Sequence, residues 1–149
     1  MNQCKKKLGP VLIQLPKTVK FDYDIAEHFY QLLAKNYKPY KFAMEVSDES
    51  WLTVDSQLLM TKYNIAFVIS HFGGYFPYAE INTAKDIYFR FYGPGTLYNT
   101  KYCVEEMPKF ARLLKKWLRQ GHELWIFFNN DWFCYGIQNT ITLCSLLTK

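Results

Sequence analysis

Five short apolar segments recur along the chain, separated by amphipathic or turn-forming stretches. They are rich in β-branched and aromatic residues and occupy about residues 11–15, 41–46, 65–70, 87–92 and 123–128. Most are continuously apolar, without polar alternation, which is typical of strands buried on both faces of a parallel sheet. The pattern therefore predicts five parallel strands.

Helical periodicity follows the strands in four places, at about residues 22–37, 55–63, 104–120 and 136–147. We expect burial of the apolar residues that share a face in the first of these helices, Ile25, Phe29, Leu32 and Leu33. The same reasoning predicts burial on the last helix of Ile137, Ile141, Cys144 and Leu147, or of their neighbours.

A loop is expected after the third strand, because Gly73, Gly74 and Pro77 disfavour a regular helix. The remaining strands alternate with helices, and parallel strands need such crossover connections. The sequence thus predicts an α/β fold, and residues 1–149 form one domain because no linker interrupts them.

Composition and charge argue against three classes of protein, namely disordered, nucleic-acid-binding and membrane-spanning proteins. Half of the 149 residues are hydrophobic and 19% are aromatic, enough apolar surface to favour a folded chain over a disordered one. The net charge is +5, but the basic residues are spread over several segments, so nucleic-acid binding is not expected. No apolar run reaches the 18 residues of a membrane span, and the short apolar start does not predict export, which together suggest a cytoplasmic protein.

Neither a metal site nor a cofactor is expected. The four cysteines, Cys4, Cys103, Cys134 and Cys144, lie far apart without metal-ligand spacing and are predicted to be free thiols. A set of Glu45, Asp48, His71 and Asp131 would suit a divalent cation, but its members come from separate elements. No phosphate-binding glycine motif is present.

Several separate segments resemble the YecE-like family, domain of unknown function family 72. They are LGPVLIQLP at residues 8–16, Glu45 with Ser50-Trp51, Gly73-Gly74 with residues 76–80, Gly93-Pro94-Gly95 with Leu97, Tyr98 and Tyr102, and FNND at residues 128–131 with Asn139. The resemblance extends from Leu8 to Leu147.

This resemblance implies a TIM-type (β/α)8 barrel in which the five strands are strands four to eight. The first three strand–helix units would lie upstream of Met1, so an N-terminally truncated barrel is expected. Five strands cannot close at the usual tilt and shear, which leaves two unpaired edges and an open apolar inner face. We therefore expect an upstream barrel fragment or self-association to complete the barrel.

The chain also departs from the family at positions expected near the barrel mouth. The family's Arg and His after the second strand are Ser47 and Asp48 here, its Asp and Arg after the third strand are His71 and Tyr75, and its His in the fourth strand is Tyr92. An inactive member of the family is one interpretation of these changes.

Candidate functional residues lie at the C-terminal strand ends, where ligands and catalysis are usually found in parallel barrels. They are Glu45, His71, Arg90, Asn129, Asn130 and Asp131. Arg90 could bind an anion, Glu45 or Asp131 could act as a general base, and His71 as an acid or base. This would suit a hydrolase or lyase acting on a small anionic or sugar-like substrate.

A structural role explains the same residues. Arg90 could pair with Glu45 across neighbouring strands, which would compensate two buried charges without a substrate. Residues 129–131 could form an Asx turn or cap backbone groups. The sequence predicts the fold and leaves the reaction, and the existence of one, open.

Overall fold

A five-stranded parallel sheet forms the centre of the computed structural model, which describes residues 7–72, 76–96 and 98–148. The strands are hydrogen-bonded in chain order and are β1 Val11–Gln14, β2 Phe42–Glu45, β3 Ile65–Phe72, β4 Asp86–Gly93 and β5 Glu123–Phe128. The α/β prediction is confirmed. Only β3 and β4 extend noticeably beyond their predicted ends, because a register shift at His71/Phe72 lets their pairing continue to Gly93.

The helices match the predicted segments. They are α1 Tyr23–Asn36, α2 Val54–Lys62, α3 Met107–Arg119 and α4 Tyr135–Thr148, with short 3-10 turns η2 Glu49–Leu52 and η3 Trp132–Cys134. Asp22 caps α1 by accepting a hydrogen bond from the Ile25 backbone N–H at 3.0 Å. Pro108 lies in the first turn of α3, where its missing N–H breaks no helical bond.

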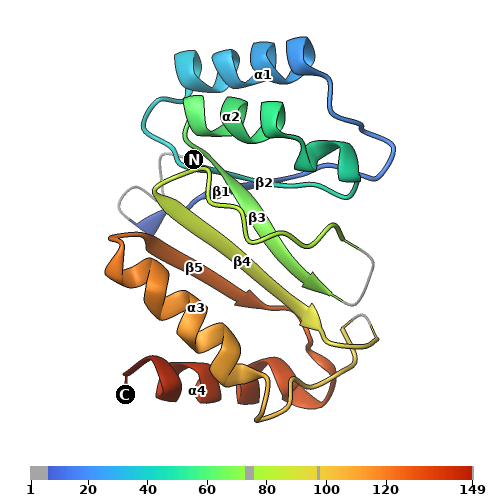
Figure 1. The fold of residues 1–149 in the computed structure, drawn as a ribbon, viewed down its shortest axis with the longest axis vertical. Coiled ribbons are helices and arrows are strands. Elements are labelled where there is room, and N and C mark those ends of the chain that lie inside the picture. The colour runs from blue at the N-terminus through green and yellow to red at the C-terminus, as the bar shows by residue number, and fades with distance from the viewer. Residues whose placement is uncertain (1–6, 73–75, 97, 149) are drawn as a thin grey trace.

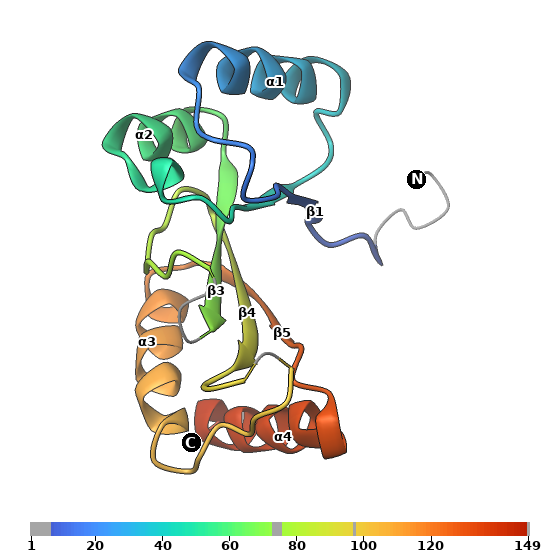
Figure 2. The ribbon, with the colours of Figure 1, turned by 90° about the vertical axis from the view of Figure 1, so that its right-hand side faces the viewer.

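All four helices lie on the outer side of a curved sheet (Figures 1 and 2). The main core fills the space between sheet and helices and includes Phe67, Phe89, Phe91, Leu114 and Trp117. A second apolar cluster lies on the inner face and consists of Ala43, Ala66, Val68 and Tyr88, with Leu12, Ala84 and Trp125 against it.

The inner face is less open than the sequence suggested. Ala43, Ala66 and Val68 are all buried, because large aromatic rings from β4 and β5 lie over these small side chains. Gly9 is close to the Trp125 ring, and a Cβ at this position would be 2.6 Å from Cζ3 of Trp125. Phe127 is the main exposed apolar side chain of β5, at 40%.

The expected buried faces of α1 and α4 were wrong in part. The sheet buries Ala26, Tyr30 and Leu33 of α1 and Gly136, Asn139 and Leu143 of α4. Several residues expected in the core are exposed instead, namely Ile25, Phe29, Leu32, Ile137, Ile141 and Cys144. Both helices carry two apolar stripes, and the sheet covers one of them.

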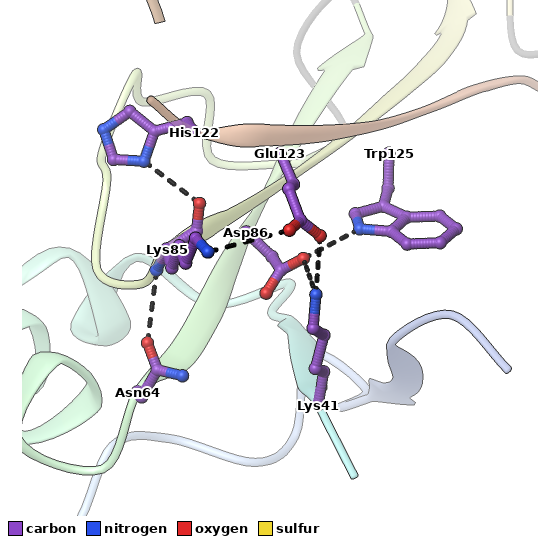
Figure 3. Close-up of polar contacts among 7 residues, drawn as sticks. All are labelled: Lys41, Asn64, Lys85, Asp86, His122, Glu123 and Trp125. Carbon is purple, nitrogen blue, oxygen red and sulfur yellow. Dashed lines mark hydrogen bonds and ion pairs between the residues drawn. The ribbon is translucent and has the colours of Figure 1, made fainter. Parts of the chain in front are cut away.

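An ion-pair cluster connects the N-terminal ends of three strands (Figure 3). The Lys41 ammonium is 2.8 Å from Asp86 Oδ1 and 2.6 Å from Glu123 Oε2. The Trp125 indole N–H also donates to Asp86, at 2.9 Å. The aspartate side chain is only 5% exposed, so these contacts compensate a buried charge.

Some sequence predictions fall on Cys4, Gly73, Gly74, Tyr75 and Leu97, which lie outside the described residues. The other three cysteines are free, as predicted, and all three are exposed. Within the described ranges, no helix has both the length and the apolarity needed to cross a bilayer.

Candidate functional site

The Glu45 carboxylate, at the C-terminal end of β2, is the centre of a polar cluster on the inner face. Its Oε1 accepts hydrogen bonds from the Ser70 hydroxyl at 2.5 Å and the Tyr92 hydroxyl at 2.9 Å. Its Oε2 accepts from Gln14 Nε2 at 2.7 Å and from Arg90 Nη1 at 2.6 Å. Strands β1 to β4 each contribute to this cluster, which we call the Glu45 cluster.

Arg90 is held from two sides in the Glu45 cluster. Besides its bond to Glu45, its Nε donates to Asn129 Oδ1 at 3.2 Å, and its guanidinium lies 4.7 Å from the Tyr92 ring centre. The Arg90 side chain is 13% exposed and that of Glu45 is 2% exposed. The ion pair is therefore nearly buried, and each charge compensates the other. The pair spans β3, so its partners are not on neighbouring strands as the sequence interpretation assumed.

The chemistry of Glu45 is limited by its partners. An ionised carboxylate has about four lone-pair sites, two on each oxygen, and four donors occupy them. Burial and the adjacent Glu45 raise the pKa of Tyr92, so this hydroxyl stays protonated and keeps donating. A general base needs a free acceptor site for the substrate proton, and Glu45 has none while these bonds persist.

His71 lies on the opposite face of the sheet from the Glu45 cluster. Side chains alternate along a strand, so Ser70 points inward and His71 points toward α3. There its Nδ1 is 2.9 Å from the Tyr102 hydroxyl oxygen, and its ring packs edge-on against Phe110 at 4.9 Å. Burial lowers the pKa of His71, which favours the neutral imidazole.

The three polar residues after β5 divide between different surroundings. Asn129 joins the Glu45 cluster through Arg90. Asn130 is fully buried and donates to the Thr100 carbonyl at 2.9 Å and to Asn139 Oδ1 at 3.0 Å, a pattern suited to holding loop and helix together. Asp131 is exposed at the start of η3. The structure thus brings together Glu45, Arg90 and Asn129 but not His71, Asn130 or Asp131.

The family profile for a protein of unknown function, DUF72, matches residues 1–149. The chain belongs to the DUF72 family. The resemblance to YecE-like proteins is consistent with this assignment. Among curated proteins, none matches this DUF72 chain significantly.

Solved DUF72 structures have the same fold. A DUF72 family protein from Thermotoga maritima MSB8 is 26% identical and superposes with a TM-score of 0.80, covering 93% of this chain and 57% of that one. One from Enterococcus faecalis V583, in two crystal structures, is 18% and 20% identical with TM-scores of 0.83 and 0.80. Those comparisons cover 97% of this chain and 60% and 62% of the other. The DUF72 chain spans about three fifths of these relatives.

The Glu45 cluster includes two residues that the sequence analysis did not select, Gln14 and Ser70. Each is the first polar residue after an uninterrupted apolar run, residues 11–13 for Gln14 and 65–69 for Ser70, which is the signal that could have identified it. The exposed aromatic pair Trp132 and Phe133 was also missed. Phe133 has a left-handed backbone with φ of 48°, a conformation that costs energy for a bulky residue.

A hollow of about 750 Å³ opens beside the C-terminal ends of β2 and β3 in the DUF72 chain. It is lined by Lys17, Ser47, Asp48, Glu49, Leu52, Phe72, Phe76, Pro77 and Tyr78. Ser47 and Asp48 are the positions at which the sequence analysis expected a departure from the family pattern. Both have local partners, because the Ser47 hydroxyl donates to the Leu15 carbonyl and Asp48 accepts from the Ser50 backbone N–H. Hydrogen bonds from Ser50 lower the pKa of Asp48.

Metal binding gains no support from the described residues, which contain no group of three or more His, Cys, Asp or Glu side chains placed to hold an ion. Glu45 is engaged by four donors, and His71 faces the helices. The Glu45 cluster is therefore best suited to fixing strands and positioning one guanidinium at the inner face.

Proposed function

We propose that this DUF72 chain is an interaction subunit that supplies five strand–helix units of a (β/α)8 barrel and binds a polypeptide that supplies the other three. The observation that carries the proposal is the open sheet. Within residues 7–72, 76–96 and 98–148, β1 pairs only with β2 and β5 only with β4.

Unpaired strand edges have a physical cost that a partner would remove. Each edge presents a row of backbone N–H and C=O groups that can pair with another strand. A parallel sheet of this curvature closes with eight strands in a TIM-type barrel. Five of eight units correspond to roughly 60% of a barrel, and the chain covers 57% to 62% of its solved relatives. The share of these relatives that has no counterpart in the chain thus corresponds to about three units.

A second candidate function is ligand binding at the C-terminal face of the completed barrel. Arg90 is fixed by Glu45 and Asn129, and the exposed Trp132 and Phe133 follow Asn129 in the chain. A positioned guanidinium recognises a carboxylate or phosphate, and an aromatic face can stack on a sugar ring. These features favour a small anionic or sugar-like ligand, whereas the occupied acceptor sites of Glu45 disfavour its use as a general base.

Sedimentation of the purified chain tests the interaction function. The chain is measured alone and mixed with the part of the Thermotoga maritima protein that has no counterpart in it, while thermal unfolding is followed by circular dichroism. The proposal predicts a one-to-one complex and a single unfolding transition at higher temperature. A chain that stays monomeric and unfolds identically with and without the added polypeptide would refute it.

Ligand binding is tested on that complex with Arg90→Ala. Inorganic phosphate and a monosaccharide are titrated while tryptophan fluorescence is recorded. Lost ligand binding with an intact fold supports a binding site, whereas unfolding of the variant supports a purely structural ion pair.

A further inference from the structure

Helix α1 carries an exposed apolar stripe on the side away from its neighbour α2. Glu27 faces α2, because its carboxylate accepts from Lys62 at 2.7 Å and from the Tyr63 hydroxyl at 3.3 Å. Ile25 and Phe29 are each two residues from Glu27, which places them about 200° around the helix. They are 71% and 36% exposed. This stripe therefore faces away from the rest of the helical layer.

Helix α4, at the other end of the sheet, has the same arrangement. Asn139 faces inward, because its side chain bonds the Tyr102 backbone, in the segment that leads into α3, at 3.0 and 3.3 Å. Ile137 and Ile141 lie two residues on either side of Asn139, again about 200° around the helix. They are 63% and 65% exposed. Both helices thus present exposed apolar stripes, and α1 and α4 are the outermost helices of the layer in Figure 1.

A groove lies next to α1, and Ile25 and Phe29 of the stripe form part of its lining. It has a volume of about 300 Å³ and is lined in part by Leu15, Val19, Ile25, Phe29 and Trp51. Val19 is 39% exposed. Adjacent helices of a barrel pack side by side over the sheet, with apolar side chains filling such grooves. The groove is therefore shaped for side chains of a further helix.

We propose that these two stripes are seats for the first and last helices of the three-unit partner. This inference rests on the interaction function proposed above and specifies where the partner docks. The last helix of the partner occupies the Ile25–Phe29 groove, and its first helix packs on Ile137 and Ile141. The partner is held at both ends, so the two seats contribute to one association.

The occupant is a three-unit polypeptide and not a second copy of this chain. Two copies would make ten strands, whereas the solved relatives exceed this chain by the length of about three units. A three-unit partner has one free strand edge and one free helix for each end of the sheet. It therefore matches both edges and both seats at once.

Single substitutions at exposed positions test this assignment. Ile25→Asp and Ile141→Asp introduce a charge at each seat, and Leu58→Asp is the matched control. Leu58 is 62% exposed on α2, away from both ends of the sheet. Because all three side chains are largely exposed, the isolated variants should fold with unchanged far-ultraviolet circular dichroism and unfolding midpoints.

The dissociation constant for the Thermotoga maritima segment is then measured by isothermal titration calorimetry. We expect at least a tenfold weaker complex for each seat variant, since each buries a charge in place of an isoleucine. The control should change the constant by less than about twofold, and the double variant should bind more weakly than either single one.

The two proposals fail in different ways. If the unmodified chain does not bind the segment, the interaction function is wrong. If it binds, but both seat variants bind like Leu58→Asp, the helix seats are wrong and the strand edges carry the association. A concentration-dependent homodimer that both seat variants disrupt would overturn the assigned occupant in favour of a second copy.

Discussion

The Glu45–Arg90 pair is the feature whose removal should reveal most about the inner face. In Glu45→Gln the side chain keeps its size, but the Arg90 guanidinium loses its counter-charge. Arg90 is only 13% exposed, so water can compensate little of the loss. Two of the four donors around the carboxylate must also face the new amide N–H₂ group, because each carboxylate oxygen accepts from two of them.

The expected loss is large on the scale of protein stability. Breaking a buried pair by removing one partner costs about 3–5 kcal/mol, and the partial exposure of Arg90 together with its bond to Asn129 reduces this to about 2–4 kcal/mol. Domains of this size have a total unfolding free energy of about 5–15 kcal/mol. We therefore expect the melting temperature to fall by roughly 5–15 °C.

Urea unfolding followed by circular dichroism measures this change for Glu45→Gln, Arg90→Met and the double variant. The pair interaction predicts that the double variant is more stable than the sum of the single effects implies, by at least about 1 kcal/mol. A loss below about 1 kcal/mol for Glu45→Gln, with additive effects in the double variant, would show that the pair is not a structural unit. The guanidinium would then be available for a ligand.

Three further predictions concern other parts of the fold. Lys41→Met removes the ammonium from the buried Asp86 carboxylate, which keeps the hydrogen bond from the Trp125 indole, so urea unfolding should show a loss of about 1–3 kcal/mol; a loss under about 0.5 kcal/mol contradicts this. Gly9→Ala places a Cβ against the Trp125 ring and should lower the melting temperature by a few degrees; an unchanged melting temperature contradicts this. Burial lowers the pKa of His71 below its ordinary 6.5, so the unfolded state takes up this proton first as the pH falls. Stability should thus decrease below about pH 6.5, and His71→Phe should flatten that slope in urea titrations between about pH 7.5 and 5.

The strands were predictable because burial on both faces leaves a simple signal. Each strand is a short run of apolar residues bounded by polar or turn-forming residues, and no other element of this length is so uniformly apolar. The helices were predictable in extent but not in orientation. Helix α1 has apolar residues on two stripes, and periodicity alone does not tell which stripe packs against the sheet and which is exposed.

The candidate site was predictable in its main pair and not in its surroundings. Polar residues at strand ends were the correct signal for Glu45, Arg90 and Asn129. The face of each side chain follows from strand alternation, which separates His71 from Ser70 although they are adjacent. The burial of Asn130 depends on Thr100 and Asn139, which belong to other segments, so no local pattern could indicate it.

The charged side chains have different partners at the two ends of the sheet. At the N-terminal strand ends, Lys41 joins Asp86 and Glu123 from β4 and β5, and Lys85 is 3.7 Å from Glu123. These pairs connect strands and leave the apolar inner face above them undisturbed. At the C-terminal ends, the Glu45 carboxylate of β2 accepts hydrogen bonds from three other strands, β1, β3 and β4. It holds the Arg90 guanidinium beside Asn129 on the face that a complete barrel would enclose. Completing the barrel would thus add both the missing strands and the other side of the Glu45 cluster, so any ligand-binding activity of this chain should appear only in the complex.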